Sequence, residues 1–271
     1  MAEQLGITTK NCTVEKEGHV MIVTLNRPEA KNALTPSMLI GMYKAWRLLD
    51  QDGDLYCAIL TGKGDTFCAG MDLKTGPGPG DDAEEIQRLM KDVPNLHWQA
   101  LLRENLPTKP IILAIEGFAV AGGTEILQGT DIRVAGESAN FGVTEVQRGL
   151  FPMAGSAVRL RRQIPYAIAA EMLLAGDDLP ARRAYELGLV NHVVPDGQAL
   201  AKAREIAERI AANGPLAVKA LVATLRATET LPEEKAFEIE QQHGMQVMMS
   251  QDAAEGPRAF LEKRKPLFTG R

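Results

Sequence analysis

The chain has 271 residues, of which 45% are hydrophobic, and a formal net charge of −5. This length and composition suffice for one domain with a full hydrophobic core and a helical appendage. The acidic balance argues against a nucleic-acid-binding protein, which would need a basic face. No apolar run approaches the roughly eighteen residues of a membrane helix, and the N-terminus lacks the pattern of a secretory signal peptide. We therefore expect no membrane partner and no nucleic-acid partner.

The cysteines and histidines show no metal-binding pattern. The chain has three cysteines, Cys12, Cys57 and Cys68. They have neither metal-ligand spacing nor a pairing pattern, which is typical of a reducing compartment, so we expect a cytoplasmic protein. The four histidines are His19, His97, His192 and His243. None has a Cys, His or acidic partner at ligand spacing, so we interpret them as surface or core residues and predict no metal site.

The N-terminal half alternates short apolar runs with helical patterns. Residues 20–25, 56–60 and 111–115 are predicted strands. Thr35 is predicted to cap a helix that runs to about residue 50. The proline that follows it fits this prediction, since proline is tolerated in the first helical turn. Repeated strand–helix units favour an α/β fold with crossover connections. No Gly-x-Gly-x-x-Gly follows a strand, so the sequence gives no support for a dinucleotide site.

From about residue 196 the pattern is helical only. Helices are predicted at 199–212 and 215–227, with Asn213-Gly214 as a C-cap between them, and a further helix begins near Pro232. We therefore predict a core at residues 1–195 and a helical region at 196–271, which packs on its own domain or on a neighbouring subunit. The Gly- and Pro-rich residues 75–82 are either a mobile loop over the site or a tolerated surface insertion.

Two acidic residues, Glu125 and Glu145, lie twenty positions apart in the most informative segment of the chain. Glu125 follows a Gly-Gly pair that opens a predicted helix among apolar residues, and Glu145 follows a short apolar segment. A lone Glu is usually a solvated surface residue, but an uncompensated carboxylate in apolar surroundings is costly. Two carboxylates that reach one apolar pocket from separate elements can divide acid and base roles, since their environments separate their pKa values. We therefore interpret the two residues as a candidate acid/base pair.

Backbone N–H groups near this pair form a candidate oxyanion hole. The helix that begins at Gly122 offers an unpaired N–H and the positive end of the helix dipole. Ala69 and Gly70 are small enough for the backbone to approach a ligand closely, so the N–H of Met71 is a candidate second donor. A phosphate-binding loop at residues 62–65 is rejected, because the Walker A spacing and the following Lys-Ser/Thr are absent.

These motifs, in this order and spacing, resemble those of the crotonase (enoyl-CoA hydratase/isomerase) superfamily over nearly the whole chain. The matching segments are Leu25-Asn26-Arg27-Pro28, Lys31-Asn32-Ala33-Leu34, Phe67-Cys68-Ala69-Gly70-Met71-Asp72-Leu73, Gly122-Gly123-Thr124-Glu125, Asp131, Phe141-Gly142, Glu145, Gly149-Leu150-Phe151-Pro152, Gly188-Leu189-Val190, Val193-Val194-Pro195 and Phe260-Leu261-Glu262-Lys263-Arg264. Each segment alone is weak evidence for this family, whereas the whole set in this order is specific for it. Residues 124–133 are most similar to those of actinobacterial members of the family. The resemblance implies that some of these members act on bulky acyl groups such as steroid side chains.

The resemblance implies a fold, an assembly and a set of site residues. The fold is an α/β spiral of repeated ββα turns, with a C-terminal helical layer used in trimerisation, and the trimers are often paired into hexamers. Glu125 and Glu145 resemble the acid/base residues, and the N–H groups of Met71 and Gly122 resemble the oxyanion donors. The substrate is an acyl-CoA thioester, and no separate cofactor is implied. The candidate CoA-binding and substrate-binding residues are Arg27, Lys31, Ala69, Asp72, Leu73 and Lys263.

Three positions depart from the family pattern. Ala121 stands where a third glycine is common, and Thr144 replaces the usual proline before the second Glu. Met153 lies in a turn that is richer in glycine elsewhere in the family, and we expect its side chain to point into or beside the acyl pocket. These departures leave the reaction class intact and leave the acyl-chain preference open.

We expect the chain to hydrate a trans-2-enoyl-CoA to a 3-hydroxyacyl-CoA in the oxidation of fatty acids or steroid side chains. The first alternative is a Δ3,Δ2-enoyl-CoA isomerase, which can act with one Glu, so the presence of both carboxylates favours hydration. The second alternative is a non-catalytic CoA-binding scaffold, which the fold alone does not exclude. The sequence leaves open which Glu is the acid and which is the base. It also leaves open whether the assembly is a trimer or a hexamer.

Overall fold

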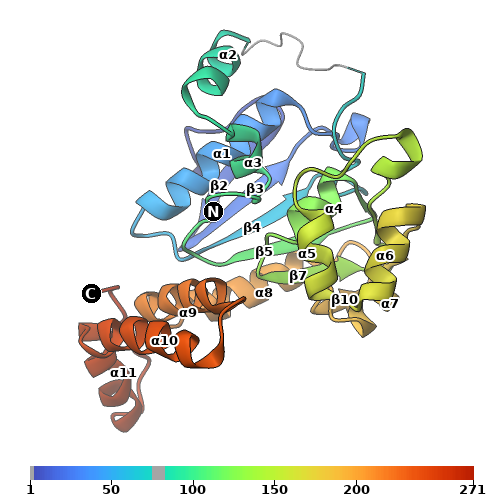
Figure 1. The fold of residues 1–271 in the computed structure, drawn as a ribbon. Coiled ribbons are helices and arrows are strands. Elements are labelled where there is room, and N and C mark those ends of the chain that lie inside the picture. The colour runs from blue at the N-terminus through green and yellow to red at the C-terminus, as the bar shows by residue number, and fades with distance from the viewer. Residues whose placement is uncertain (1–2, 75–82) are drawn as a thin grey trace.

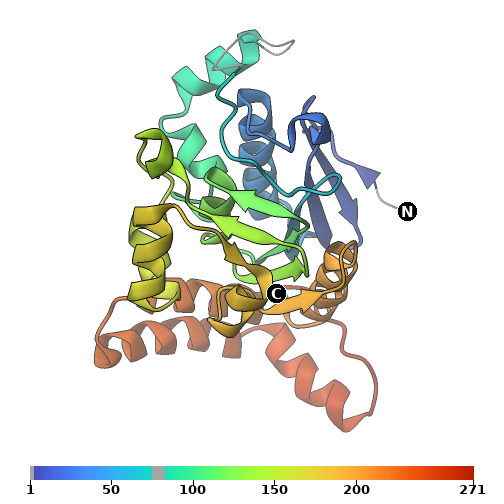
Figure 2. The same cartoon turned by 90° about the vertical axis from the view of Figure 1, so that its right-hand side faces the viewer.

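The computed structural model describes residues 3–74 and 83–271. The predicted loop at residues 75–82 lies outside this part of the chain. Most of the described chain forms an α/β core, and the last helices extend from its base (Figures 1 and 2).

The core is built on a seven-stranded sheet in the order β1-β2-β3-β4-β5-β7-β10. The strands are β1 (Glu3–Gln4), β2 (Cys12–Glu17), β3 (Val20–Leu25), β4 (Cys57–Gly62), β5 (Ile111–Ile115), β7 (Ile132–Gly136) and β10 (His192–Val194). From β3 to β10 all pairs are parallel, while β1 and β2 are antiparallel to their neighbours. The central strands are continuous apolar runs because both faces of a parallel sheet are covered. The three strands predicted from the sequence are confirmed.

A second, smaller sheet contains β6 (Phe118–Val120), β8 (Asn140–Gly142) and β9 (Leu179–Pro180). Strand β6 follows β5 and β8 follows β7, and the pairs β5–β7 and β6–β8 are both parallel. Parallel bridges from Cys68 to Ala119 and from Leu34 to Met71 continue the same pattern. Each turn of the chain therefore adds one strand to each sheet, which is the spiral that the sequence resemblance implied.

Helices cover both faces of the large sheet. Within the core these are α1 (Pro36–Gln51), α2 (Ala83–Asp92), α3 (Leu96–Ala100), α4 (Gly122–Leu127), α5 (Ser156–Gln163), α6 (Tyr166–Ala175) and α7 (Ala181–Glu186), with the short 3₁₀ helices η1 (Pro28–Ala30) and η2 (Glu145–Arg148). Thr35 caps α1 as predicted, and its hydroxyl accepts a hydrogen bond from the N–H of Met38 at 3.3 Å. The main apolar core lies between the sheets and α1.

The C-terminal quarter is helical, as predicted, with α8 (Ala199–Ala211), α9 (Pro215–Thr228), α10 (Glu233–Met248) and α11 (Gln251–Leu261). Helix α8 packs on the large sheet, where Ala203 and Ile206 join a core with Ile59 and Ile112. Helices α9 to α11 form an arm that projects from the core (Figures 1 and 2). The division into a core at residues 1–195 and a helical region at residues 196–271 stays a prediction.

The predicted C-cap at Asn213-Gly214 is wrong. Gly214 has φ −59° and ψ 114° and is the N-cap of α9, whereas the C-cap of α8 is Ala212, which has a right-handed helical conformation. The cause is Pro215, because a proline forces the residue before it away from the helical region and toward extended backbone. The Gly214 backbone therefore starts the second helix and does not close the first one.

No helix in the described part of the chain is long and apolar enough to cross a membrane.

Candidate active site

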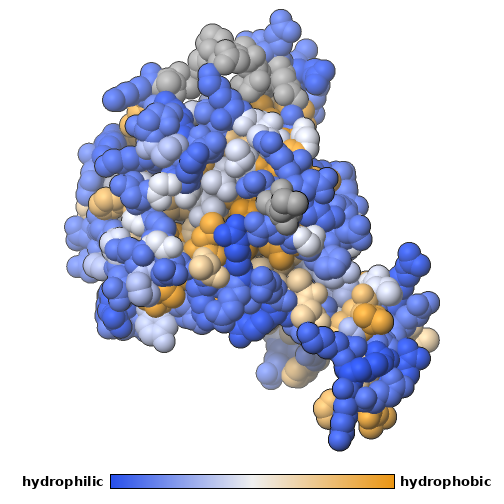
Figure 3. Space-filling view, turned by 180° about the vertical axis from the view of Figure 1, so that it is seen from behind, coloured by the Kyte–Doolittle hydropathy of each residue, from blue (hydrophilic) through white to orange (hydrophobic). Residues whose placement is uncertain are grey.

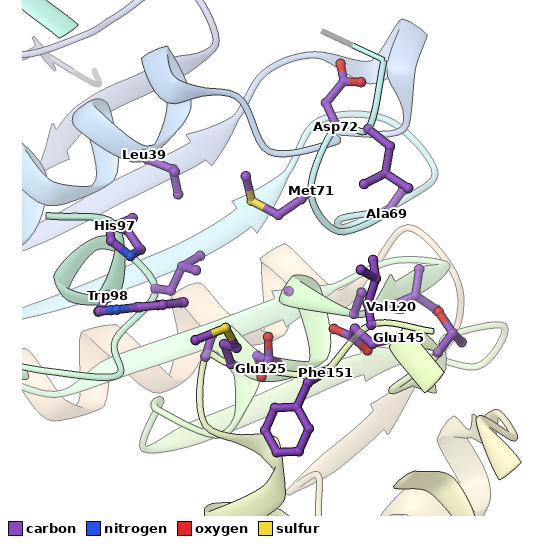
Figure 4. Close-up of a pocket in the computed structure, with 18 of the residues that line it drawn as sticks. Leu39, Ala69, Met71, Asp72, His97, Trp98, Val120, Glu125, Glu145 and Phe151 are labelled. Atoms are coloured by element: carbon purple, nitrogen blue, oxygen red, sulfur yellow. The ribbon is translucent and has the colours of Figure 1, made fainter. Parts of the chain in front are cut away.

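The register of the small sheet brings Glu125 and Glu145 together. In the parallel pair β6–β8, Val120 lies opposite Gly142. The chain therefore leaves both strands at the same edge, where β6 continues into α4 and β8 continues into η2. Glu125 lies in the first turn of α4 and Glu145 begins η2. Both side chains line one cavity (Figure 4).

Glu125 is almost completely buried, with 4% of its surface exposed. Its Oε1 accepts a hydrogen bond at 3.3 Å from the N–H of Ser156, the first residue of α5. Burial raises the pKa of Glu125 to about 7; the bond from Ser156 opposes this rise, and the negative charge of Glu145 adds to it. A carboxyl with this pKa exists in both protonation states near neutral pH, which suits proton transfer.

Glu145 is half-buried and differs from Glu125 in its surroundings. Burial raises its pKa, while its own backbone N–H and the positive charge of Arg148 lower it. Its Oε2 is buried and accepts no hydrogen bond from the described residues. An unpaired buried carboxylate oxygen is costly unless a ligand or water meets it, so the atom is available to a molecule in the cavity.

The N–H groups of Met71 and Gly122 lie on two backbone segments that touch. A Cβ added at Gly70 would lie 2.8 Å from the Cβ of Ala121 and 3.6 Å from the backbone nitrogen of Gly122. Gly70 has φ +84°, so both its conformation and its surroundings need glycine. Gly122 is the first residue of α4, and its N–H therefore has no acceptor within the helix. The arrangement provides two neighbouring backbone segments at the edge of the cavity.

The cavity has a volume of about 870 Å³ and a mostly apolar lining. Figure 4 shows Glu125 and Glu145 on one wall, Met71 and Leu39 on the opposite wall, and His97 and Trp98 at one end. Met153 also lines the cavity, as predicted from the sequence. This volume lies in the upper range for small-molecule sites, which are about 300–1,000 Å³.

The predicted CoA-binding and substrate-binding residues divide into two groups. Ala69, Asp72 and Leu73 line the cavity. Arg27, Lys31 and Lys263 do not line it. Arg27 is joined to the lining residue Asp72 by an ion pair of 2.5 Å. The Lys31 ammonium lies 5.9 Å from the centre of the Phe118 ring, and Lys263 is exposed two residues beyond the end of α11.

Sequence reasoning missed one wall of the cavity. That wall comes from α1, α2 and α3 and includes Leu39, Met90, His97 and Trp98. His97 contacts Trp98, with their ring centres 4.1 Å apart, and burial lowers the pKa of its imidazole. The sequence predicts His97 only as a surface or core residue, whereas the structure has it in the cavity wall. No motif marks this wall in the sequence, because apolar residues at helical spacing are also what a core helix contains.

The chain is similar to known proteins over nearly its whole length. The profile of the family described as enoyl-CoA hydratase/isomerase matches residues 15–271. The chain is 55% identical to enoyl-CoA hydratase EchA19 of Mycobacterium tuberculosis over 95% of this chain and 96% of that protein. It is 36% identical to (E)-benzylidenesuccinyl-CoA hydratase of Thauera aromatica, over 95% and 98% of the two chains.

Among solved structures, a putative enoyl-CoA hydratase/isomerase from Mycobacterium abscessus superimposes with a TM-score of 0.87 at 46% identity. The match covers 97% of this chain and 100% of that one. The mycobacterial relatives agree with the predicted similarity to actinobacterial members. The chain therefore belongs to the enoyl-CoA hydratase/isomerase family of the crotonase superfamily and is an enzyme of that family.

Proposed function

We propose that the enzyme adds water across the double bond of a trans-2-enoyl-CoA and forms the 3-hydroxyacyl-CoA. One observation carries this proposal: two carboxyl side chains, Glu125 and Glu145, share an apolar cavity beside the backbone of Met71 and Gly122. Hydration needs one group that takes a proton from water and one that gives a proton to carbon, and this pair supplies both.

In the proposed mechanism the thioester oxygen accepts hydrogen bonds from the N–H groups of Met71 and Gly122. The water lies between Glu125 and Glu145; its oxygen bonds to C3 and one of its protons passes to the ionised carboxylate. The protonated carboxyl gives its proton to C2, so the pair exchanges roles in each turnover. The electron pair of the double bond moves toward the thioester oxygen during the addition, and each oxyanion donor there is worth about 3 kcal/mol.

We propose that no separate cofactor takes part. The thioester carbonyl already polarises the double bond, so water attacks C3 once the oxygen is stabilised. Coenzyme A enters and leaves as part of the substrate and product.

A kinetic comparison separates this function from its alternatives. A hydratase removes the ultraviolet absorbance of the conjugated crotonyl-CoA as water adds. An isomerase acts on a 3-enoyl-CoA and leaves crotonyl-CoA unhydrated, and a scaffold protein converts neither compound. We expect rapid loss of the crotonyl-CoA absorbance together with formation of 3-hydroxybutyryl-CoA.

The acyl group is proposed to be larger than crotonyl, either a fatty acyl chain or a bulky group such as a steroid side chain. The cavity volume of about 870 Å³ supports this, as do the flexible side chains of Met71, Met90 and Met153 on its walls. Relatives include a mevalonyl-coenzyme A hydratase of Aspergillus fumigatus at 38% identity, so acyl groups vary among similar chains. A panel of straight-chain and ring-bearing enoyl-CoA substrates tests the preference through kcat/KM.

We propose a homotrimer or a dimer of trimers in which the arm of helices α9 to α11 contacts a neighbouring subunit. Apolar residues are exposed on this arm (Figure 3), among them Leu225, Met249, Phe260 and Leu261. Large exposed apolar surfaces commonly mark interaction sites. In such an assembly Lys263, which is remote from the cavity of its own chain, would meet the phosphates of a CoA bound to the neighbour. Sedimentation analysis of the full chain measures the subunit number.

We also propose a cytoplasmic location. Cys12, Cys57 and Cys68 are free and buried, and burial raises the pKa of each thiol to about 12. Free thiols are usual in a reducing compartment. Fractionation of the native cells tests the location.

A further inference from the structure

Two buried polar side chains, Gln128 and Ser156, lie beside Glu125, and neither is among the described residues that line the cavity. Gln128 is 4% exposed and Ser156 is fully buried. Gln128 is the C-cap of α4, three residues after Glu125, and Ser156 is the first residue of α5. Neither side chain takes part in the proposed proton transfers, so their burial next to Glu125 needs another explanation.

The side-chain amide of Gln128 joins the two helices. Its Nε2 donates a hydrogen bond of 3.1 Å to the carbonyl oxygen of Thr124 in α4 and one of 2.8 Å to the hydroxyl of Ser156. The Thr124 carbonyl can only accept a hydrogen bond, so the NH₂ group of the amide must face it. This fixes the orientation of the amide, and both hydrogens of its NH₂ group are used, one on each helix.

Ser156 in turn holds the carboxyl group of Glu125. Its backbone N–H donates a hydrogen bond of 3.3 Å to Oε1 of Glu125. The same residue therefore receives Gln128 on its hydroxyl and holds Glu125 with its N–H. A chain of hydrogen bonds runs from the end of α4 to the first residue of α5 and back to the carboxyl in the first turn of α4.

Gln128 is a costly residue for a position that needed only packing. Its Oε1 is buried and has no hydrogen-bond partner among the described residues. An unpaired buried amide oxygen is unfavourable, and an apolar side chain of similar size would avoid this cost. The advantage of the amide over such a side chain is its two donors. Both of them fix groups that adjoin Glu125.

We propose that Gln128 is a positioning residue for Glu125. By holding the hydroxyl of Ser156, it keeps the Ser156 N–H directed at the Glu125 carboxyl and keeps that carboxyl where it exchanges protons with the substrates. This inference rests on the proposed hydration and adds a residue outside the cavity to those that determine its rate. A displacement of about 1 Å in a catalytic group can cost about 10²-fold in rate, so the contact acts on kcat.

The kinetic experiment replaces Gln128 and follows hydration of crotonyl-CoA. Gln128→Leu removes both donors at similar size and should reduce kcat by about 10-fold to 10²-fold, with little change in KM. Ser156→Ala removes the hydroxyl, keeps the N–H and should show a similar loss. The double variant should lose no more than Gln128→Leu, since both substitutions break one hydrogen bond. In a Glu125→Gln background, Gln128→Leu should have no further effect on kcat.

Gln163, near the other end of α5, provides a matched control. Its Nε2 donates a hydrogen bond of 3.0 Å to the backbone carbonyl of Gln128, so it also joins α5 to the end of α4. Within the described part of the chain it makes no hydrogen bond to Ser156 or Glu125, and its Oε1 is also buried and unpaired. Gln163→Leu should therefore keep kcat. Thermal unfolding of each variant confirms that it is folded.

A second measurement needs no substrate. The infrared carboxyl band of Glu125 is followed across pH as the difference between Glu145→Gln and Glu145→Gln/Glu125→Gln proteins, in which the charged neighbour at position 145 is absent. Burial raises the pKa of Glu125, and the N–H of Ser156 opposes that rise. Weakening this bond should therefore raise the midpoint in Gln128→Leu and in Ser156→Ala, whereas Gln163→Leu should leave it unchanged.

Three results would overturn the inference. The first is an unchanged kcat and midpoint in folded Gln128→Leu protein. The second is an equal loss of kcat in Gln163→Leu, and the third is an undiminished further loss in the Glu125→Gln background, because both would show a general effect on packing. If the parent hydrates no enoyl-CoA but the midpoint shifts as expected, the proposed reaction is wrong and the positioning of Glu125 by Gln128 stands.

Discussion

The backbone N–H of Ala121 donates a hydrogen bond of 2.8 Å to the carbonyl oxygen of Gly142. This bond continues the pairing of β6 with β8 and joins the two segments that carry the carboxylates, one residue before α4 and three residues before Glu145. On its other side the Ala121 segment touches Gly70, which precedes Met71. Three chain segments that are far apart in the sequence and come from successive turns of the spiral therefore meet, and all candidate proton-transfer and oxyanion groups come from their ends.

The backbone conformation of Ala121 predicts a measurable strain in the folded chain. Its φ of 50° and ψ of −122° lie in a region that favours glycine, and its Cβ lies close to Gly70. Ala121→Gly should therefore stabilise the fold by about 1 kcal/mol, although the more flexible unfolded chain offsets part of this gain. Urea unfolding at pH 7 measures the difference. A lower free energy of unfolding in Ala121→Gly would show that the alanine methyl contributes more by packing than it costs by strain.

The buried carboxyl of Glu125 predicts a pH-dependent stability. Its pKa is about 7 in the folded chain against an ordinary value of 4.5, so the folded state binds the proton more tightly than the unfolded state. The resulting stabilisation is full below about pH 4.5 and is lost as pH rises through 7, with a total of about 3 kcal/mol.

Glu125→Gln removes this group at nearly constant shape. The variant should match the parent near pH 5 and be more stable than the parent at pH 8, because the parent then buries a charge. Chemical unfolding at both pH values makes the comparison. Equal parent and variant stability at pH 8 would mean that Glu125 is solvated when ionised.

Gly122 and Met71 should respond differently to substitution if only their backbone N–H groups act. Gly122→Pro deletes the N–H and should reduce kcat by about 10²–10³-fold, the usual effect of losing one oxyanion donor. Met71→Leu keeps the N–H, and its side chain lines the cavity, so it should keep kcat for crotonyl-CoA and change only the preference for larger acyl groups. A large loss of kcat with crotonyl-CoA in folded Met71→Leu protein would show that the donor lies elsewhere.

Lys263 tests the proposed contact between subunits. Lys263→Ala should raise KM for acyl-CoA with little change in kcat, because a contact with the CoA phosphates is the same in the ground state and the transition state. The effect should weaken at high salt, where exposed charges are screened. Lys265→Ala is a control at a neighbouring exposed lysine. An unchanged KM at low ionic strength, or the same rise in both variants, would remove Lys263 from the binding site.

The sequence predicted the residues at the ends of the strands better than the walls of the cavity. Glu125, Glu145 and the 69–73 segment lie at or just after glycines where close backbone approach leaves no room for a side chain. His97, Trp98 and Met90 reach the cavity only through the packing of α2 and α3, and their pattern is that of any partly buried helix. The Gly214 error has a similar origin, since a glycine after a helix predicts a C-cap until the proline beyond it is considered.

The contact of Arg148 could not be predicted from the sequence either. Its NH1 group donates a hydrogen bond of 3.3 Å to the hydroxyl of Thr144, four residues earlier, and this contact depends on the 3₁₀ geometry of η2. Residue types alone do not indicate it, because a surface arginine is usually solvated.

The central claim is that both carboxyl groups transfer protons, and the rates of two single variants test it most directly. Hydration of crotonyl-CoA is measured for the parent, Glu125→Gln and Glu145→Gln, with acyl-CoA binding measured separately by calorimetry. Each variant keeps the shape of the site and loses one proton-transfer group, so each should lose about 10²–10⁴-fold in kcat while binding acyl-CoA. If either folded variant hydrates crotonyl-CoA at nearly the parental rate, the two-carboxylate mechanism is wrong and a single Glu performs the reaction.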